Sequence, residues 1–394
     1  MIKISPYFSL LLIAVAICFS NKTLAQHSLS IRLNNIPANT AADNIFAAGN
    51  FNGWNPADDA YRFSKNANGQ WELTIPNLSS GNYEFKFTRG SWEKVACAAS
   101  GTDIPNYVLQ LTSDSTMQFD VEAWKDNFAS APKKHTATAN VSIIDTAFYI
   151  PQLDRKRRIW IYLPQDYAQS KKRYPVLYMH DGQNVFDELT SGFGEWGVDE
   201  CLDSLSKSNR YQCIVVGIDN GPKRLNEYNP FYNERFGEGE GDAYAKFIAY
   251  TLKPFIDSSY RTLKDRRNTI IAGSSMGGLI SYYAAIKYPE VFGKAGIFSP
   301  AFWTAEPGIN NLTDSLARKI NGKFFFFMGG QEGDEYMNDM FEVMQSLATN
   351  SSALMYAAID PDGKHNEATW RKWFPEFLKF IMADWTNYII DTTE

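Results

Sequence analysis

The sequence predicts two folded units, a small all-β immunoglobulin-like sandwich followed by an α/β unit with a mainly parallel sheet flanked by helices. Three observations lead to this prediction. The chain of 394 residues exceeds the length that one hydrophobic core usually serves. Residues 29–124 alternate short apolar stretches with Asn-Gly, Gly-Asn and Ser-Gly turn pairs. From residue 141 onward, continuous apolar runs alternate with helical periods.

The first 25 residues have the pattern of an export signal. Lys3 precedes an apolar run over residues 8–19, and a polar stretch then ends at Ala25, a small residue suited to cleavage. The run is too short to favour spanning a bilayer. We therefore expect a secreted or periplasmic protein that starts near Gln26 and has no membrane span.

Residues 29–124 predict the sandwich because short strands recur at nearly regular spacing. The predicted strands are 30–33, 45–48, 71–75, 83–87 and 117–121. Residues 125–140 are rich in Ala, Ser, Thr, Lys and Pro, which is typical of an exposed linker.

Residues 141–388 predict the α/β unit. Buried strands are expected at 174–179, 213–218, 269–272, 295–298, 323–328 and 354–358. Helices are expected around 197–207, 241–257, 276–288, 335–348 and 368–386. Such alternation gives a mainly parallel sheet, and ligands bind beyond the carboxyl ends of its strands.

Charge and cysteine content exclude some functions. Removing residues 1–25 takes away Lys3 and Lys22 and no acid, so the formal net charge moves from −6 to −8 and argues against nucleic acid as a partner. The three remaining cysteines, Cys97, Cys201 and Cys213, lack metal-binding spacing, and we expect no metal or other cofactor. A Cys201–Cys213 disulfide and two buried free thiols are both open alternatives.

The most informative motif is Gly273-Ser274-Ser275-Met276-Gly277, which lies between a predicted strand and a predicted helix. In a G-x-S-x-G turn the central serine occupies a strained corner and is exposed above the sheet. Ser275 is therefore the candidate nucleophile. It needs a base to take its proton.

Four histidines are available as that base. His27 lies beside the predicted cleavage site and His135 lies in the predicted linker, which leaves His180 and His365. Enzymes with this elbow place nucleophile, acid and base in that chain order, which selects His365, in the loop after the last strand.

The acid is expected after the strand at 323–328, where Glu332, Asp334 and Glu335 compete. A carboxylate there would fix the imidazole tautomer and stabilise the imidazolium. Asp334 and Glu335 fall in the first turn of the next helix, where acids complement the helix dipole. We therefore favour Glu332.

Acyl transfer also needs two donors for the oxyanion. The backbone N–H of Met276, directly after the nucleophile, is the first. The second would come from the loop after residue 179, through the N–H of Gly182 or Gln183. We expect His180 and Asp181 in that loop to pair with each other and to be scaffold. The loop that contains Arg224 is expected to border the site, where a substrate-recognition role is a hypothesis.

From residue 141 to about 386 the chain resembles the esterase family of α/β-hydrolases that includes enterochelin, feruloyl and acetyl-xylan esterases and mycolyltransferases. The matching stretches are HDGQNVFDE at 180–188, EWGVDE at 195–200, VVGIDNG at 215–221, EYNP at 227–230, GSSMGG at 273–278, GGQEGDE at 329–335 and GKHNEATW at 363–370. The resemblance implies Ser275 as nucleophile, Glu332 as acid and His365 as base. It implies oxyanion donors at Met276 and Gln183.

The amino-terminal unit resembles carbohydrate-binding modules of families 20 and 48, through GNFNGW at 49–54, YEFKF at 83–87, WE at 92–93 and IPN at 104–106. The resemblance implies a starch-type sugar site at Trp54, Lys86, Trp92 and Asn106. An indole face can stack on a sugar ring. The alternative is that both tryptophans are core residues or pack the module against the esterase domain.

The sequence therefore predicts a secreted serine esterase that hydrolyses acetyl or feruloyl esters on a carbohydrate through an acyl-enzyme on Ser275. Three alternatives stay open. They are an acyltransferase to a sugar hydroxyl, a siderophore ester hydrolase, and a non-catalytic polysaccharide-binding protein.

Overall fold

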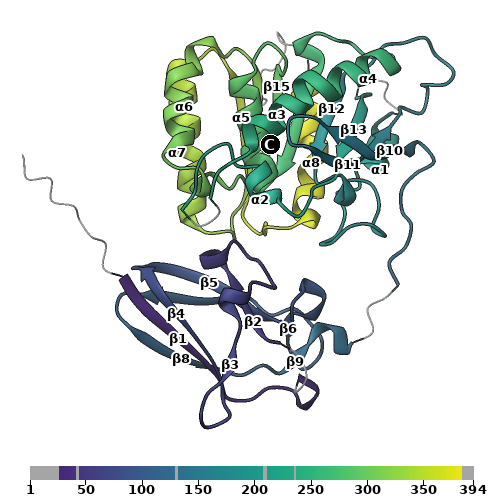
Figure 1. The fold of residues 1–394 in the computed structure, drawn as a ribbon. Helices are drawn as coiled ribbons and strands as arrows, with labels where there is room; N and C mark the ends of the chain where they lie inside the picture. Colours follow the sequence, from purple (N-terminus) through teal and green to yellow (C-terminus); the bar gives the residue numbers. More distant parts are fainter. Residues whose placement is uncertain (1–25, 41–43, 129–131, 207–210, 235–236, 384–394) are drawn as a thin grey trace, which may run out of the picture. The chain divides into compact units, whose positions relative to one another are not determined.

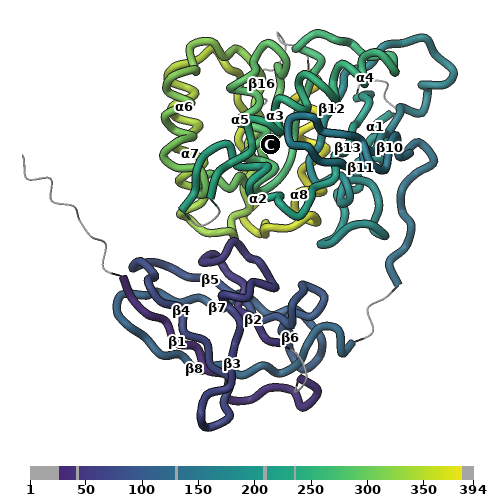
Figure 2. Tube along the Cα trace, in the orientation of Figure 1, coloured from purple at the N-terminus to yellow at the C-terminus, as the bar shows by residue number. Residues whose placement is uncertain are grey.

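The structure is a computed structural model that describes residues 26–40, 44–128, 132–206, 211–234 and 237–383. The predicted export signal lies outside the described residues. The chain divides between residues 130 and 131 into two compact units, which are described separately (Figures 1 and 2). This division falls inside the predicted linker.

The first unit is all-β. Its strands are β1 (Gln26–Leu33), β2 (Phe46–Gly49), β3 (Ser64–Lys65), β4 (Trp71–Ser79), β5 (Gly81–Thr88), β6 (Ala96–Cys97), β7 (Tyr107–Leu111), β8 (Ser115–Phe119) and β9 (Ala123–Trp124). The main sheets have the orders β3-β4-β1-β8 and β2-β5-β7. β1 and β8 pair in parallel, whereas β1 and β4 pair antiparallel.

Alternation of side chains builds the core of this unit. Leu29, Ile31 and Leu33 on β1 are buried, as are Phe85 and Phe87 on β5. Successive side chains of a strand point to opposite faces, so every second residue reaches the space between the sheets. These five residues belong to one hydrophobic cluster.

The second unit contains an eight-stranded sheet of order β10-β11-β13-β12-β14-β15-β16-β17. The strands are β10 (Val141–Ile150), β11 (Arg155–Tyr162), β12 (Val176–His180), β13 (Ile214–Ile218), β14 (Thr269–Ser274), β15 (Lys294–Phe298), β16 (Lys323–Gly329) and β17 (Leu354–Asp360). β10 and β11, which were not predicted as strands, pair antiparallel. β11 also pairs antiparallel with β13, and the five remaining neighbouring pairs are parallel. The predicted mainly parallel α/β sheet is confirmed.

Helices cover both faces of this sheet (Figure 1). They are α1 (Val198–Leu205), α2 (Arg224–Glu227), α3 (Gly241–Phe247), α4 (Lys253–Ser259), α5 (Met276–Lys287), α6 (Gly308–Leu316), α7 (Asp334–Asn350) and α8 (Glu367–Met382). One apolar cluster joins the sheet to α3 through α7, and a second joins it to α1 and α8. α6, which was not predicted, lies beside α7 (Figure 2).

Part of the predicted linker packs on the second unit. The Thr138 N–H donates to Asp199 at 2.7 Å, and His135 Nδ1 lies 2.6 Å from an oxygen of Asp187. Cys201 and Cys213 are free, so the structure contains free thiols at these positions and not the disulfide. Within the described residues, no helix combines the length and apolar character needed to cross a bilayer.

Candidate active site

Ser275 occupies a strained turn between β14 and α5. Its backbone has φ 58° and ψ −123°, a conformation that costs free energy for a residue with a Cβ. Residues 269–286 are all buried except Ser275, which is half-buried. A Cβ on Gly273 would lie 2.9 Å from the His180 ring, so this turn requires glycine there. The predicted elbow geometry is therefore present.

Glu332 and His365 are hydrogen-bonded through Oε2 and Nδ1 at 2.6 Å. The Glu332 side chain is 3% exposed, whereas the His365 side chain is 45% exposed. The other Glu332 oxygen accepts hydrogen bonds from the Ser299 hydroxyl at 2.6 Å and the Gly329 N–H at 2.8 Å. Both carboxylate oxygens of Glu332 are thus hydrogen-bonded, which fixes the orientation of this carboxylate relative to the His365 imidazole.

Close backbone packing brings the acid and base loops together. β16 and β17 are neighbours, and the loops that follow them meet at Gly329 and Gly363. A Cβ on Gly329 would lie 2.6 Å from the carbonyl carbon of Gly363. The Gln331 N–H donates to the Gly363 carbonyl at 3.0 Å. A side chain at either glycine would separate Glu332 from His365.

Two residues that the sequence analysis missed support this pair. Trp370 Nε1 donates to the Ser299 hydroxyl at 2.9 Å, and the His365 ring meets the Trp370 ring edge-on at 5.1 Å between centroids. Trp370 lies one turn into α8, so its place in the GKHNEATW stretch could have indicated this role. Ser299 follows β15, and no pattern in the sequence distinguishes it.

Ser299 also connects the pair to the elbow. The Ser275 N–H donates to the Phe298 carbonyl at 2.9 Å, and the Ala301 N–H donates to the Ser275 carbonyl at 3.1 Å. Ser299 lies between these two partners and bonds Glu332. The Ser275 turn, Glu332 and His365 are therefore all built on one edge of the sheet.

The loop after β12 lies against the start of α5. A Cβ on Gly277 would be 3.4 Å from a carboxylate oxygen of Asp181. A short 3₁₀ turn follows over Gly182–Asn184. Within the described part of the chain, the N–H groups of Gln183 and Met276 donate no hydrogen bond. Both N–H groups therefore remain available to donate to a bound group.

The expected pairing of His180 with Asp181 is wrong. His180 is buried, and its Nδ1 lies 3.0 Å from the Tyr244 hydroxyl. Burial lowers the pKa of His180 to about 3, so the ring is neutral. Asp181 instead receives two hydrogen bonds from Arg224, at 2.7 and 2.8 Å, and one from Asn220 at 2.6 Å. The two residues are scaffold, but with separate partners.

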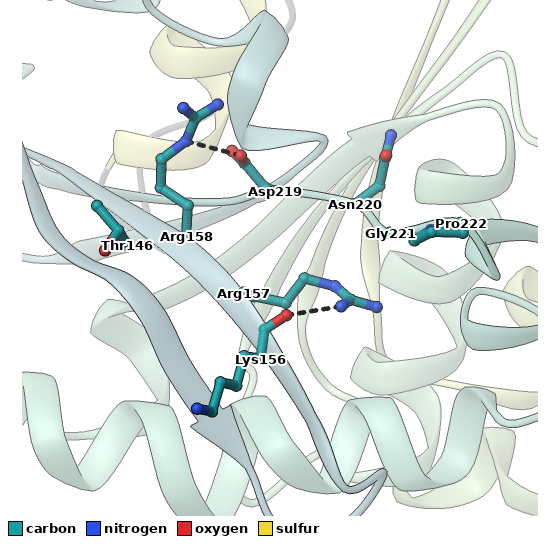
Figure 3. A pocket seen from close by; sticks show the side chains of 8 residues that line it. All are labelled: Thr146, Lys156, Arg157, Arg158, Asp219, Asn220, Gly221 and Pro222. Carbon is teal, nitrogen blue, oxygen red and sulfur yellow. Dashed lines mark hydrogen bonds and ion pairs between the residues drawn. The ribbon is translucent and has the colours of Figure 1, made fainter.

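Arg224 stabilises the loop after β12, because its Nε and one Nη donate hydrogen bonds to the Asp181 carboxylate. Burial acts to raise the pKa of the Asp181 carboxyl, but the Arg224 guanidinium holds that pKa below its ordinary value. Asn220 belongs to the loop after β13, which borders an open hollow of about 410 Å³ (Figure 3). In that view Arg158 is ion-paired with Asp219 at 2.8 Å.

In the first unit the structure brings together two of the four predicted sugar-site residues. The rings of Trp54 and Trp92 are 6.2 Å apart between centroids, and both side chains are half-buried. The Lys86 ammonium donates to the Ile104 carbonyl, and burial lowers its pKa. The Asn106 amide donates to Glu84 at 2.9 Å. Both polar residues therefore have partners within the unit.

The fold and the elbow define an α/β-hydrolase. Residues 150–381 match the model of the family described as "Putative esterase", and the chain belongs to this family. It is thus a member of a family of carboxylic ester hydrolases, as the sequence motifs predicted. The BES protein from Bacillus cereus has the same fold, with a TM-score of 0.53, 17% identity, and coverage of 65% of this chain and 100% of that chain.

Three curated relatives extend the comparison. An endo-1,4-beta-xylanase/feruloyl esterase of Xylanibacter ruminicola is 24% identical over 252 residues, covering 63% of this chain and 32% of its own. An iron(III) salmochelin esterase of Escherichia coli is 27% identical over 237 residues, covering 55% of this chain and 52% of its own. An alpha-amylase of Niallia circulans is 37% identical over 102 residues, covering 25% of this chain and 8% of its own. The chain spans about half or less of the length of these relatives.

Proposed function

We propose that the protein is a secreted serine esterase whose triad is Ser275, His365 and Glu332. The observation that carries the proposal is the Glu332–His365 hydrogen bond of 2.6 Å, built on the same sheet edge as the strained Ser275 turn. A buried acid that holds an accessible imidazole is the pairing that activates a serine.

The proposed reaction runs through an acyl-enzyme. The Ser275 hydroxyl attacks the ester carbonyl while His365 Nε2 takes its proton, and Glu332 stabilises the imidazolium. The N–H groups of Met276 and Gln183 stabilise the oxyanion. The imidazolium then gives its proton to the leaving alcohol. Water, activated by His365, attacks the acyl-enzyme and releases the acid and free Ser275.

We propose a carbohydrate-linked acetyl or feruloyl ester as substrate. The feruloyl esterase relative supports this class of ester. The adjacent Trp54 and Trp92 rings support a sugar-binding role for the first unit, because paired indoles offer faces for sugar rings. A siderophore ester is the second candidate, favoured by the 27% identity to a salmochelin esterase. Transfer of the acyl group to a sugar hydroxyl would use the same acyl-enzyme.

The first test is hydrolysis of p-nitrophenyl acetate by residues 26–394. We expect Ser275→Ala and His365→Ala each to lower kcat by about three orders of magnitude or more. Ser258→Ala and His135→Ala, at exposed positions, are matched controls that should retain activity. Turnover that survives Ser275→Ala would refute the assignment. Product analysis with feruloylated and acetylated glycans, a catecholate siderophore, and an added sugar acceptor would then separate the substrate classes.

A further inference from the structure

A further carboxyl group, that of Glu367, lies near the proposed base and outside the proposed triad. Glu367 is the first residue of α8, two residues after His365, and is only 6% exposed. One of its oxygens accepts a hydrogen bond from the Asn184 side-chain amide at 3.2 Å. Burying a carboxyl group costs free energy unless hydrogen bonds or a paired charge compensate for the lost hydration. Glu367 is not used in the proposed reaction.

Asn184 organises the loop that carries Gln183. Its N–H donates to the Asp181 carbonyl at 2.8 Å, and its carbonyl accepts from the Trp196 N–H at 2.8 Å. Its side-chain oxygen accepts from the Gly192 N–H at 3.0 Å. With the bond to Glu367, each polar group of Asn184 has a partner. Residue 183 is therefore held between Asp181, which Arg224 binds, and Asn184, which Glu367 binds.

We propose that Glu367 is a positioning residue that, through Asn184, holds the loop of residues 181–184 against the loop of residues 363–367. The proposal rests on the proposed function, because it assigns the Gln183 N–H to the oxyanion. Glu367 links the oxyanion donor to the base loop. A donor that shifts by a fraction of an ångström loses much of its effect on the transition state.

The charge of Glu367 adds a second effect. The charged or titratable groups that act on it are Asp181 in the loop after β12, Arg224 at the start of α2, and His365 in the loop that precedes α8. Glu195 and Arg371, on the flanking loop and on α8, pair with each other. Burial raises the pKa of Glu367 to about 7. Above that pH the carboxylate favours the imidazolium that forms on His365 during attack, and below it the neutral acid does not.

Four variants test the proposal in the full mature chain with p-nitrophenyl acetate. We expect Glu367→Ala and Asn184→Ala each to lower kcat about 10-fold to 100-fold, with KM changed less than about threefold. The kcat of the double variant should fall no further than that of the worse single variant, because both substitutions remove the same Asn184–Glu367 hydrogen bond. Glu367→Gln keeps an acceptor for Asn184 and should stay within about fivefold of wild type at pH 6. Glu376→Ala, an acid further along the same helix, is the matched control.

The pH profile tests the charge effect, whereas the loss in kcat at nearly constant KM and the rescue by Glu367→Gln separate positioning from simple support of the fold. The ratio of wild-type kcat to Glu367→Gln kcat should rise about threefold or more between pH 6 and pH 8. Losses that multiply in the double variant, or a Glu367→Ala kcat within about twofold of wild type, would each overturn the positioning proposal, and a flat ratio would overturn the charge effect. Circular dichroism tests whether the variants fold. Failure of the proposed function is distinct, because Ser275→Ala would then retain activity.

Discussion

Glu332 and His365 are 33 positions apart in the chain, yet Oε2 of Glu332 lies 2.6 Å from Nδ1 of His365. The Glu332 side chain is almost fully buried and the His365 side chain is nearly half exposed. This asymmetry suits a pair in which one partner orients and the other exchanges protons with substrate.

Replacing Glu332 with Gln tests which acid orients the base. The amide cannot stabilise an imidazolium and favours the wrong tautomer, so we expect kcat for p-nitrophenyl acetate to fall by about three to four orders of magnitude. Asp334→Asn, at the exposed first turn of α7, removes only a dipole interaction worth about 0.3–1 kcal/mol and should change kcat less than about threefold. An equal or larger loss in Asp334→Asn would reverse the assignment of the acid.

The buried His180 predicts loss of stability in acid. Its pKa is about 3 in the folded protein, below the ordinary value of 6.5. Between these values the unfolded chain binds a proton that the folded chain does not. The free energy of unfolding therefore falls as pH drops from 6.5 toward 3, and is unaffected by this group above 6.5.

His180→Phe removes this titration while keeping a ring beside Tyr228 and Tyr244. Urea unfolding of the full chain measures the free energy of unfolding at pH 7 and at pH 4.5. We expect the decrease in this free energy between the two pH values to be about 2 kcal/mol smaller in His180→Phe than in wild type. The comparison uses the change with pH, so a lower stability of the variant at pH 7 does not affect it. Equal losses in wild type and His180→Phe would show that His180 is protonated in the folded state.

The paired indoles predict a glycan affinity that is independent of ester hydrolysis. Trp54→Ala and Trp92→Ala should each weaken binding to soluble starch at least about tenfold, because each removes one stacking face. Hydrolysis of p-nitrophenyl acetate should be unchanged. Trp71→Ala, a half-buried tryptophan on β4 that contacts Lys65, is the matched control. Affinity electrophoresis in starch gels measures the effect, and no binding by wild type would contradict the sugar site.

Much of the second unit could be predicted from the sequence, because buried parallel strands are continuous apolar runs and helices show their own period. β10 and β11 were missed. Their sequences, VSIIDTAFYI and RKRRIWIY, mix charged and apolar residues because these strands lie toward the edge of the sheet and part of their surface is exposed. α6 was missed because its few apolar residues contact the core only through one narrow face.

The sequence by itself determined the strand–turn–helix at Ser275 and, through chain order, the proposed base His365 and the loop that holds the proposed acid, since these depend on local residue types and on topology. Tertiary structure alone decided the partners. His180 and Asp181 are adjacent in the chain, but one is bound by Tyr244 and the other by Arg224. Ser299 reaches Glu332 because β15 and β16 are neighbours in the sheet. Local sequence fixes which backbone turn forms, whereas side-chain partners come from segments that only the packed sheet brings within hydrogen-bonding distance.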